Sequence, residues 1–239
     1  MTTVPEAILA YANGSPEGQI LSPKEFLHLG ARTAVDQALS RLAREGHLIR
    51  VDRGAYVAPV QDKTGCRPPL AEKVIESLAA LSGELIALDG ASSAMALGLT
   101  ECGQVVSEGY VTSGRSRILV LGGVDVPLQH APAWMLALGD GPAGAAVRAM
   151  AWFGADAVDK TLAKVRRSLS SSEWLTLVAC RAALPSWMAR AIGESDARGA
   201  PLREAFKRVP APAGSGFGVL DVKAEAPAEV LSNQTMGTA

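Results

Sequence analysis

The sequence is poor in the residue types from which metal centres and disulfide frameworks are built. Only three cysteines occur among the 239 residues, and they are far apart and without a Cys-x-x-Cys pair. The three histidines are equally scattered, with no two of them four residues apart. These spacings predict neither a disulfide framework nor a metal site, and no cofactor is expected. A reducing compartment such as the cytoplasm fits this cysteine usage.

Long apolar runs and an excess of charge of either sign are also absent. Proline, glycine or a charged residue interrupts every apolar run before about 18 residues, and Glu6 stands where a signal peptide carries basic residues. We therefore expect neither export nor a membrane partner. Basic and acidic side chains nearly balance, 23 against 24, which argues against a protein coated with cationic residues. Any contact with nucleic acid must then be local.

The chain divides into regions of different composition. The stretch QDKTGCRPP predicts a linker at residues 61–69, between an N-terminal domain at residues 1–60 and a second domain at residues 70–199. The composition then shifts to stretches such as PAPAGSGFG, so residues 200–239 are expected to form a disordered tail.

The N-terminal domain has the pattern of a helix-turn-helix followed by a hairpin. A Ser-Pro-x-Glu sequence beginning at Ser22 starts a short helix that Gly30 ends. A second helix follows from Arg32 to Glu45, and two short strands flank the turn Asp52-Arg53-Gly54. The apolar stripe of the second helix consists of Val35, Ala38, Leu39 and Leu42. This order of elements predicts a winged helix.

Polar and basic side chains of this unit have the chemistry needed to bind DNA. Glutamine can pair with adenine and arginine with guanine in the major groove, while arginine on a wing can bind phosphates. The alternative is an ordinary solvated face, because Asp36, Glu45 and Asp52 offset much of the charge. The candidate DNA-binding residues are Arg32, Thr33, Gln37, Ser40, Arg41, Arg44, Arg50 and Arg53.

The second domain combines helical and strand patterns but shows no catalytic motif. Three runs rich in Val, Ile and Leu, within EGYVTSG and RILVLGGVDVPLQHA, predict a small antiparallel sheet. Helices are expected at residues 144–153, 156–169 and 172–192, the last interrupted at Pro185. Ser92 and Ser93 lack the second glycine of a nucleophile elbow, and GDGPAG lacks the Lys-Ser/Thr of a phosphate loop. We predict that the protein is not an enzyme.

The fold class that these patterns predict is α+β, with an N-terminal winged helix-turn-helix. It continues into a mixed α/β domain with a small antiparallel sheet and C-terminal helices. This second domain also carries a basic pattern that could bind DNA or an acidic partner. The favoured interpretation is an ordinary solvated face, because rows of exposed lysine are common on protein surfaces. Its members are Arg115, Arg117, Lys160, Lys164 and Arg167.

Two blocks of the sequence together resemble a known family. The first is GARTAVDQALSRLAREGHLIRVDRGAYVAP, and the second, after the linker, is DGASSAMALGLTECGQVVSEGYVTSGRSRILVLGGVDVPLQHAP. Over about residues 5–190 the chain is similar to the AbiEi-type antitoxins of bacterial type IV toxin–antitoxin systems. The resemblance implies a winged helix that represses its own operon and a second domain that helps to counter a nucleotidyltransferase toxin.

Two functions therefore remain open. One is a repressor and antitoxin whose partners are its own promoter DNA and a cognate nucleotidyltransferase toxin. The other is a winged-helix regulator whose second domain senses a small ligand. In either case we expect a homodimer or two copies on one operator, because winged helices often bind inverted half-sites in pairs.

Overall fold

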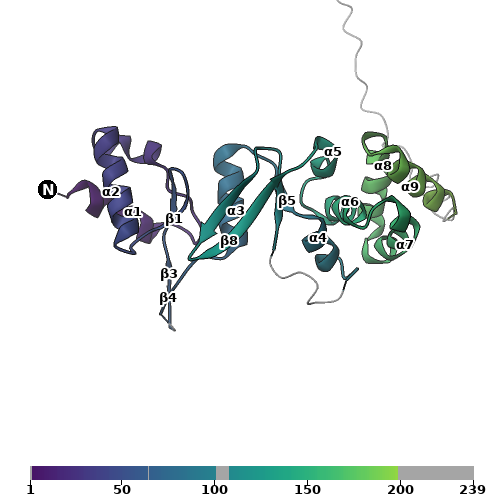
Figure 1. The fold of residues 1–239 in the computed structure, drawn as a ribbon, viewed down its shortest axis with the longest axis horizontal. Helices are drawn as coiled ribbons and strands as arrows, with labels where there is room; N and C mark the ends of the chain where they lie inside the picture. Colours follow the sequence, from purple (N-terminus) through teal and green to yellow (C-terminus); the bar gives the residue numbers. More distant parts are fainter. Residues whose placement is uncertain (1, 64, 101–107, 199–239) are drawn as a thin grey trace, which may run out of the picture. The chain divides into compact units, whose positions relative to one another are not determined.

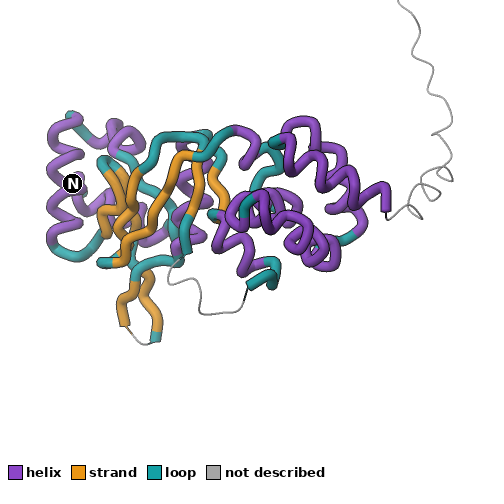
Figure 2. Tube along the Cα trace, turned by 45° about the vertical axis from the view of Figure 1, so that its right-hand side comes forward, coloured by secondary structure: helices purple, strands orange, loops and turns teal. Residues whose placement is uncertain are grey.

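The computed structural model describes residues 2–63, 65–100 and 108–198, all within one compact unit. These residues form a mixed α/β fold with small sheets in the first two thirds of the chain and helices after them (Figures 1 and 2). The tail predicted at residues 200–239 lies outside the described residues. No helix in the described ranges is long and apolar enough to cross a membrane.

The N-terminal region consists of three helices and a hairpin. The helices are α1 (Val4–Gly14), the 3₁₀ helix η1 (Pro23–Leu29) and α2 (Arg32–Arg44). The predicted start of η1 is confirmed by a capping box, in which the Ser22 hydroxyl accepts from Lys24 N at 3.2 Å. The hairpin pairs β1 (Ile49–Asp52) with β2 (Ala55–Val57) in antiparallel register.

The predicted apolar stripe of α2 is confirmed, because all four of its residues are buried. They pack against Ile8 of α1, Phe26 of η1 and Tyr56 of β2. The turn between β1 and β2 also lies where it was predicted. Gly54 there has a φ of 72°, a left-handed conformation that glycine adopts without steric cost.

The segment predicted as a linker at residues 61–69 contains strands. β3 (Val60–Asp62) pairs with β4 (Gly65–Arg67) as a second small hairpin. Val51 and Val57, before this segment, pack in one hydrophobic core with Val74 and Leu119, which lie after it. Apolar burial across the hairpin therefore joins the two predicted domains, a feature that the composition of QDKTGCRPP does not reveal.

The second region is built around a four-stranded sheet. Its strands are β5 (Ile86–Leu88), β6 (Tyr110–Thr112), β7 (Arg117–Leu121) and β8 (Val124–His130), in the order β5-β6-β8-β7. The predicted small antiparallel sheet is confirmed for the pairs β5–β6 and β7–β8, whereas β6 and β8 pair in parallel. The β7–β8 hairpin places β8 between β6 and β7. The chain reverses direction between β6 and β7 and again between β7 and β8, so β8 runs parallel to β6. Helix α3 (Ala71–Ser82) shares a core with one face of this sheet.

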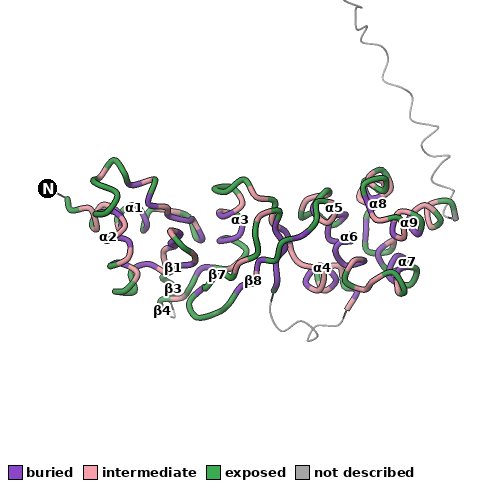
Figure 3. Tube along the Cα trace, turned by 45° about the horizontal axis from the view of Figure 1, so that its top comes forward, coloured by how far each residue is buried: buried purple, intermediate pink, exposed green. Residues whose placement is uncertain are grey.

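Helices make up the rest of the described chain. α4 (Gly90–Ala96) precedes β6, and α5 (Ala133–Leu136) follows β8. α6 is buried over most of its length (Figure 3), and the break predicted at Pro185 separates α8 from α9. The last helices and turns are α6 (Pro142–Phe153), η2 (Ala155–Ala157), α7 (Val158–Ser168), α8 (Ser171–Cys180), η3 (Arg181–Ala183) and α9 (Ser186–Arg198).

Candidate nucleic-acid interface

The outer face of α2 presents an exposed polar surface. Thr33, Gln37 and Arg44 are all exposed, and they lie opposite the buried stripe of the same helix. Gln37 and Arg44 also line a hollow of about 500 Å³ between α2 and the first residues of α1. A base edge or a phosphate could approach these side chains without disturbing the core.

Each acidic residue that offsets the arginines has a basic partner of its own. Asp36 binds Arg32 at 2.9 Å. Glu45 lies 3.9 Å from the Arg41 guanidinium, and both of these pairs are about half exposed. Such exposed pairs on one helix contribute little to stability. In each pair the carboxylate offsets the positive charge of the arginine.

The third acidic residue, Asp52, forms an ion pair with a residue of the second region. Its Oδ2 lies 3.5 Å from Nε of Arg117, and its Oδ1 accepts a hydrogen bond from the backbone N–H of Arg53 at 2.6 Å. Among the residues that the structure describes, the side chains of Arg44 and Arg53 therefore have no acidic partner. Of the predicted DNA-binding arginines, these two have neither an ion pair nor a side-chain hydrogen bond among the described residues, whereas Arg50 donates to a carbonyl of its own hairpin.

Two predicted contact residues are less free than the sequence suggests. The Ser40 hydroxyl is half-buried and lies 3.4 Å from the hydroxyl of Tyr56, so it faces the hairpin rather than open solvent. Arg50 is exposed, but its Nε donates to the carbonyl of Asp52 at 3.4 Å. The helical periodicity predicts Ser40 on the outer face of α2. In the structure β2 packs against α2, and Tyr56 of β2 covers the Ser40 hydroxyl.

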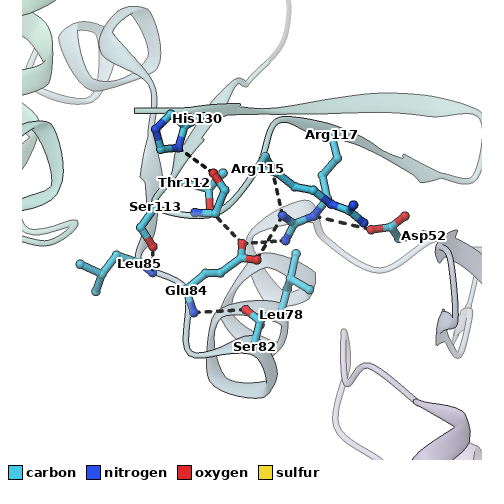
Figure 4. Close-up of polar contacts among 11 residues, drawn as sticks. Asp52, Leu78, Ser82, Glu84, Leu85, Thr112, Ser113, Arg115, Arg117 and His130 are labelled. Carbon is cyan, nitrogen blue, oxygen red and sulfur yellow. Dashed lines mark hydrogen bonds and ion pairs between the residues drawn. The ribbon is translucent and has the colours of Figure 1, made fainter. Parts of the chain in front are cut away.

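One residue of the predicted secondary basic surface is wrongly assigned. The side chain of Arg117 is only 12% exposed and forms a two-pronged ion pair with Glu84, with Nη2 2.8 Å from Oε2 (Figure 4). Arg117 is therefore committed to internal carboxylates and is not free to bind DNA. Arg115, two residues earlier, is exposed as expected.

Glu84 is held by side chains from two strands of the sheet, β6 and β7. The Thr112 hydroxyl donates to Oε2 at 2.8 Å, and Arg117 donates to both carboxylate oxygens. Burial is the largest single influence on the pKa of Glu84, and it raises that pKa because it disfavours the charged form. The hydrogen bonds from Arg117 and Thr112 lower the pKa, and together they outweigh burial. The pKa of Glu84 is consequently lowered. The carboxylate is charged at neutral pH.

The basic row on α7 has the geometry of a solvated face. Lys160, Lys164 and Arg167 are exposed, while Leu162 and Val165 on the opposite side are buried. Arg167 Nε donates to the carbonyl of Ala163, one turn earlier in the same helix, at 3.2 Å, and Lys164 Nζ reaches the carbonyl of Leu99 at 3.5 Å. These contacts favour the solvated-face interpretation without excluding a partner.

The structure also contains a buried cation that the sequence analysis missed. Arg148 of α6 is fully buried, and its Nη1 donates to the carbonyl of Gly139 at 2.7 Å. Its Nε donates to the Ser93 hydroxyl at 3.3 Å. Burial lowers the pKa of Arg148 to about 10, although Asp140 acts in the opposite direction. A single arginine in an alanine-rich helix gives no pattern by which its burial could be predicted.

The serines of α4 take part in the packing of that helix. The Ser92 hydroxyl accepts from Gly109 N at 3.1 Å, and the Ser93 hydroxyl donates to the carbonyl of Leu88 at 3.1 Å. Both residues are buried. No group of three or more His, Cys, Asp or Glu side chains that could hold a metal occurs in the described ranges.

Comparison with known proteins finds no match among curated proteins or among solved structures. A family model matches residues 7–174, which is more than half of the chain and extends from α1 into α8. The matched span includes α2, both hairpins and the four-stranded sheet. The chain therefore belongs to the family described as DUF6088, a family of unknown function.

Proposed function

We propose that the protein is a DNA-binding transcriptional regulator whose N-terminal region acts as a winged helix. The order α1, η1, α2 and the β1–β2 hairpin supports this proposal, since a winged helix has helices in this order followed by a β-ribbon. In this arrangement α2 is the recognition helix, and the turn at Asp52-Arg53-Gly54 is the tip of the wing.

The observation that carries the proposal is the distribution of ion pairs. On α2, Arg32 and Arg41 each lie beside an acidic side chain one helical turn away. Arg44 and Arg53 have no acidic partner within the described residues, although acidic residues lie close by in the sequence. Unmatched arginines beside an exposed Gln37 suit a surface that meets phosphates and base edges.

The two elements have different roles in this proposal. Gln37 and Thr33, on α2, contact base edges and so determine which sequence is bound. Arg53, on the hairpin, binds a phosphate and adds affinity for any sequence. Arg44 serves either role, because its side chain lies on the same outer face as Gln37.

Repression of its own operon and antagonism of a nucleotidyltransferase toxin are proposed on the resemblance to the AbiEi-type antitoxins. The two matching blocks contain the β1–β2 hairpin and the strands β6 to β8. A growth assay tests this part: a nucleotidyltransferase encoded beside this gene is expressed alone and together with the protein. Rescue of growth by co-expression is expected, and toxicity that persists with soluble, folded protein contradicts the antitoxin role.

The experiment that tests DNA binding is a gel shift on the DNA upstream of the gene, at several salt concentrations. Gln37→Ala is expected to relax the preference at one or two base pairs, because a base-edge contact provides about 1–3 kcal/mol of discrimination. Arg53→Ala is expected to weaken all sequences alike and to reduce the salt slope by about one unit. Arg190→Ala, at an exposed position of α9, is the matched control.

Equal affinity of the wild type, Gln37→Ala, Arg44→Ala and Arg53→Ala at low and high salt would remove the recognition-helix assignment. Each variant is first shown to be folded by its circular dichroism spectrum. The three positions are exposed, so loss of the fold is not expected.

Sensing of a small ligand by the second region is a second candidate, favoured by a cavity of about 490 Å³. The cavity lies between α3 and the sheet, and its size is in the range of ligand sites. Ile75, Ile86 and Leu88 give it an apolar part, and Glu72 and Glu108 a polar one. A ligand panel tests this candidate: a rise in the melting temperature together with a changed gel shift supports it.

A further inference from the structure

Arg117 joins three parts of the chain that are distant in sequence. Its Nη1 and Nη2 bind the two carboxylate oxygens of Glu84, at 3.2 and 2.8 Å, and its Nε lies 3.5 Å from the carboxylate of Asp52 (Figure 4). Asp52 belongs to the β1–β2 hairpin, and Arg117 is the first residue of β7 in the sheet of the second region. The guanidinium therefore bridges the hairpin and the sheet.

On the sheet side of this bridge, several contacts fix the position of Glu84. Glu84 follows the end of α3 and also accepts from the Thr112 hydroxyl of β6 at 2.8 Å. Gly114 leaves room for the carboxylate, because a Cβ at that position would lie within 2.6 Å of Oε2 of Glu84. With Glu84 fixed in this way, the Arg117 guanidinium has a defined position and its Nε is directed at Asp52.

The hairpin side of the bridge is the turn itself. The Asp52 carboxylate binds Arg117 through Oδ2 and the backbone N–H of Arg53 through Oδ1. One carboxylate thus ties the backbone of the turn to the sheet. Below the turn, Val51 and Val57 share a core with Leu119 of β7, so the hairpin also has an apolar contact with the same strand.

We propose that Arg117 is a positioning residue, which holds the tip of the β1–β2 hairpin through Asp52 and so sets where Arg53 meets DNA. The DNA step of this inference rests on the function proposed above. The second region then influences DNA binding without touching DNA, because a change at Glu84 or Arg117 alters the ion pair that holds Asp52, the neighbour of Arg53.

The sign of one substitution separates positioning from simple charge. Asp52→Asn removes a negative charge next to the proposed phosphate contact, so electrostatics alone predicts tighter binding. If Arg117 positions the hairpin through Asp52, the same substitution releases the turn and weakens binding. The two mechanisms thus predict opposite effects for one conservative change.

The test compares Asp52→Asn, Arg117→Gln and the double variant in the full chain. Two matched controls change the same charges at exposed positions, Asp125→Asn on β8 and Arg181→Gln on η3. DNA affinity and its salt dependence are measured by gel shift on the upstream DNA. Amide hydrogen exchange of the DNA-free protein is measured for the hairpin and, for comparison, for α8.

We expect each single variant to lower DNA affinity about twofold to fivefold, the upper part of the range for loss of one partly exposed ion pair. The double variant should bind no more weakly than Arg117→Gln alone, because that substitution already removes the link to Asp52. The salt slope should fall by about one unit, as for Arg53→Ala. Amides of the hairpin should exchange faster in both single variants, whereas those of α8 should not change.

Tighter DNA binding by Asp52→Asn, or additive effects in the double variant, would overturn the positioning role. Unchanged hydrogen exchange of the hairpin in both single variants would overturn it independently of DNA. If hairpin exchange rises but the wild-type protein binds no DNA, the link between hairpin and sheet stands and the proposed function fails. If the wild type binds DNA and Arg53→Ala weakens it while Asp52→Asn does not, the function stands and this inference fails.

Discussion

Replacement of Glu84 by glutamine directly tests the ion pair that fixes Arg117 within the second region. The substitution keeps the size of the side chain and an oxygen that can accept from Thr112, but it removes the charge that Arg117 binds. The side chains of Arg117 and Glu84 are 12% and 23% exposed, so the pair lies between a surface pair and a buried one.

The expected size of the effect follows from this intermediate burial. Exposed ion pairs contribute about 0.2–1 kcal/mol, and removal of one partner of a fully buried pair costs about 3–5 kcal/mol. For Glu84→Gln we expect a loss of about 2 kcal/mol in the free energy of unfolding. At a typical urea dependence this lowers the unfolding midpoint by roughly 1 M. Glu76→Gln on α3 is the control, because its partner Lys73 is exposed and the loss should stay below about 0.5 kcal/mol.

The pH dependence of this difference provides a second, independent test. The pKa of Glu84 in the folded protein lies below the ordinary value of 4.5, so the ionised carboxylate stabilises the fold above pH 4.5. That stabilisation is lost as the pH falls through the lowered folded-state pKa. The gap between wild type and Glu84→Gln should therefore be full at pH 7 and shrink in acid. Equal losses for Glu84→Gln and Glu76→Gln, or a gap that is the same at pH 7 and in acid, would refute this reasoning.

Three further outcomes are expected. Arg148→Ala should lower stability by about 3–5 kcal/mol, measured by urea unfolding, because it leaves a cavity and removes the donor to the Gly139 carbonyl; a loss below 1 kcal/mol would contradict this role. Leu39→Ala should lower the free energy of unfolding by about 2–5 kcal/mol, because Leu39 of α2 is fully buried. If Leu39→Ala melted at the same temperature as Gln37→Ala, the buried face of α2 would be wrongly assigned. Limited proteolysis should cut first after Ala200 and in the β3–β4 hairpin, because residues 61–63, 65 and 66 there are exposed, and first cuts inside α2 would contradict this expectation.

The sequence by itself determined the local elements of the N-terminal region. The capping box at Ser22 and the stripe from Val35 to Leu42 depend on neighbours within one or two helical turns, so the chain specifies them locally. The exposure of Gln37 and Arg44 follows from the same periodicity. These features were predicted correctly because their causes lie close together in the sequence.

Only the tertiary structure decided which charges neutralise one another. Asp52 and Arg117 are 65 residues apart, and Glu84 and Arg117 are 33 residues apart, so no periodicity relates them. The parallel pairing of β6 with β8 is likewise set by how the hairpin β7–β8 packs against β6. Arg117 looked like a surface cation in the sequence because its partners come from the segment after α3 and from the β1–β2 hairpin. Long-range packing, rather than local pattern, therefore pairs Asp52 with Arg117 instead of with the neighbouring Arg53, and it assigns Arg117 to the interior.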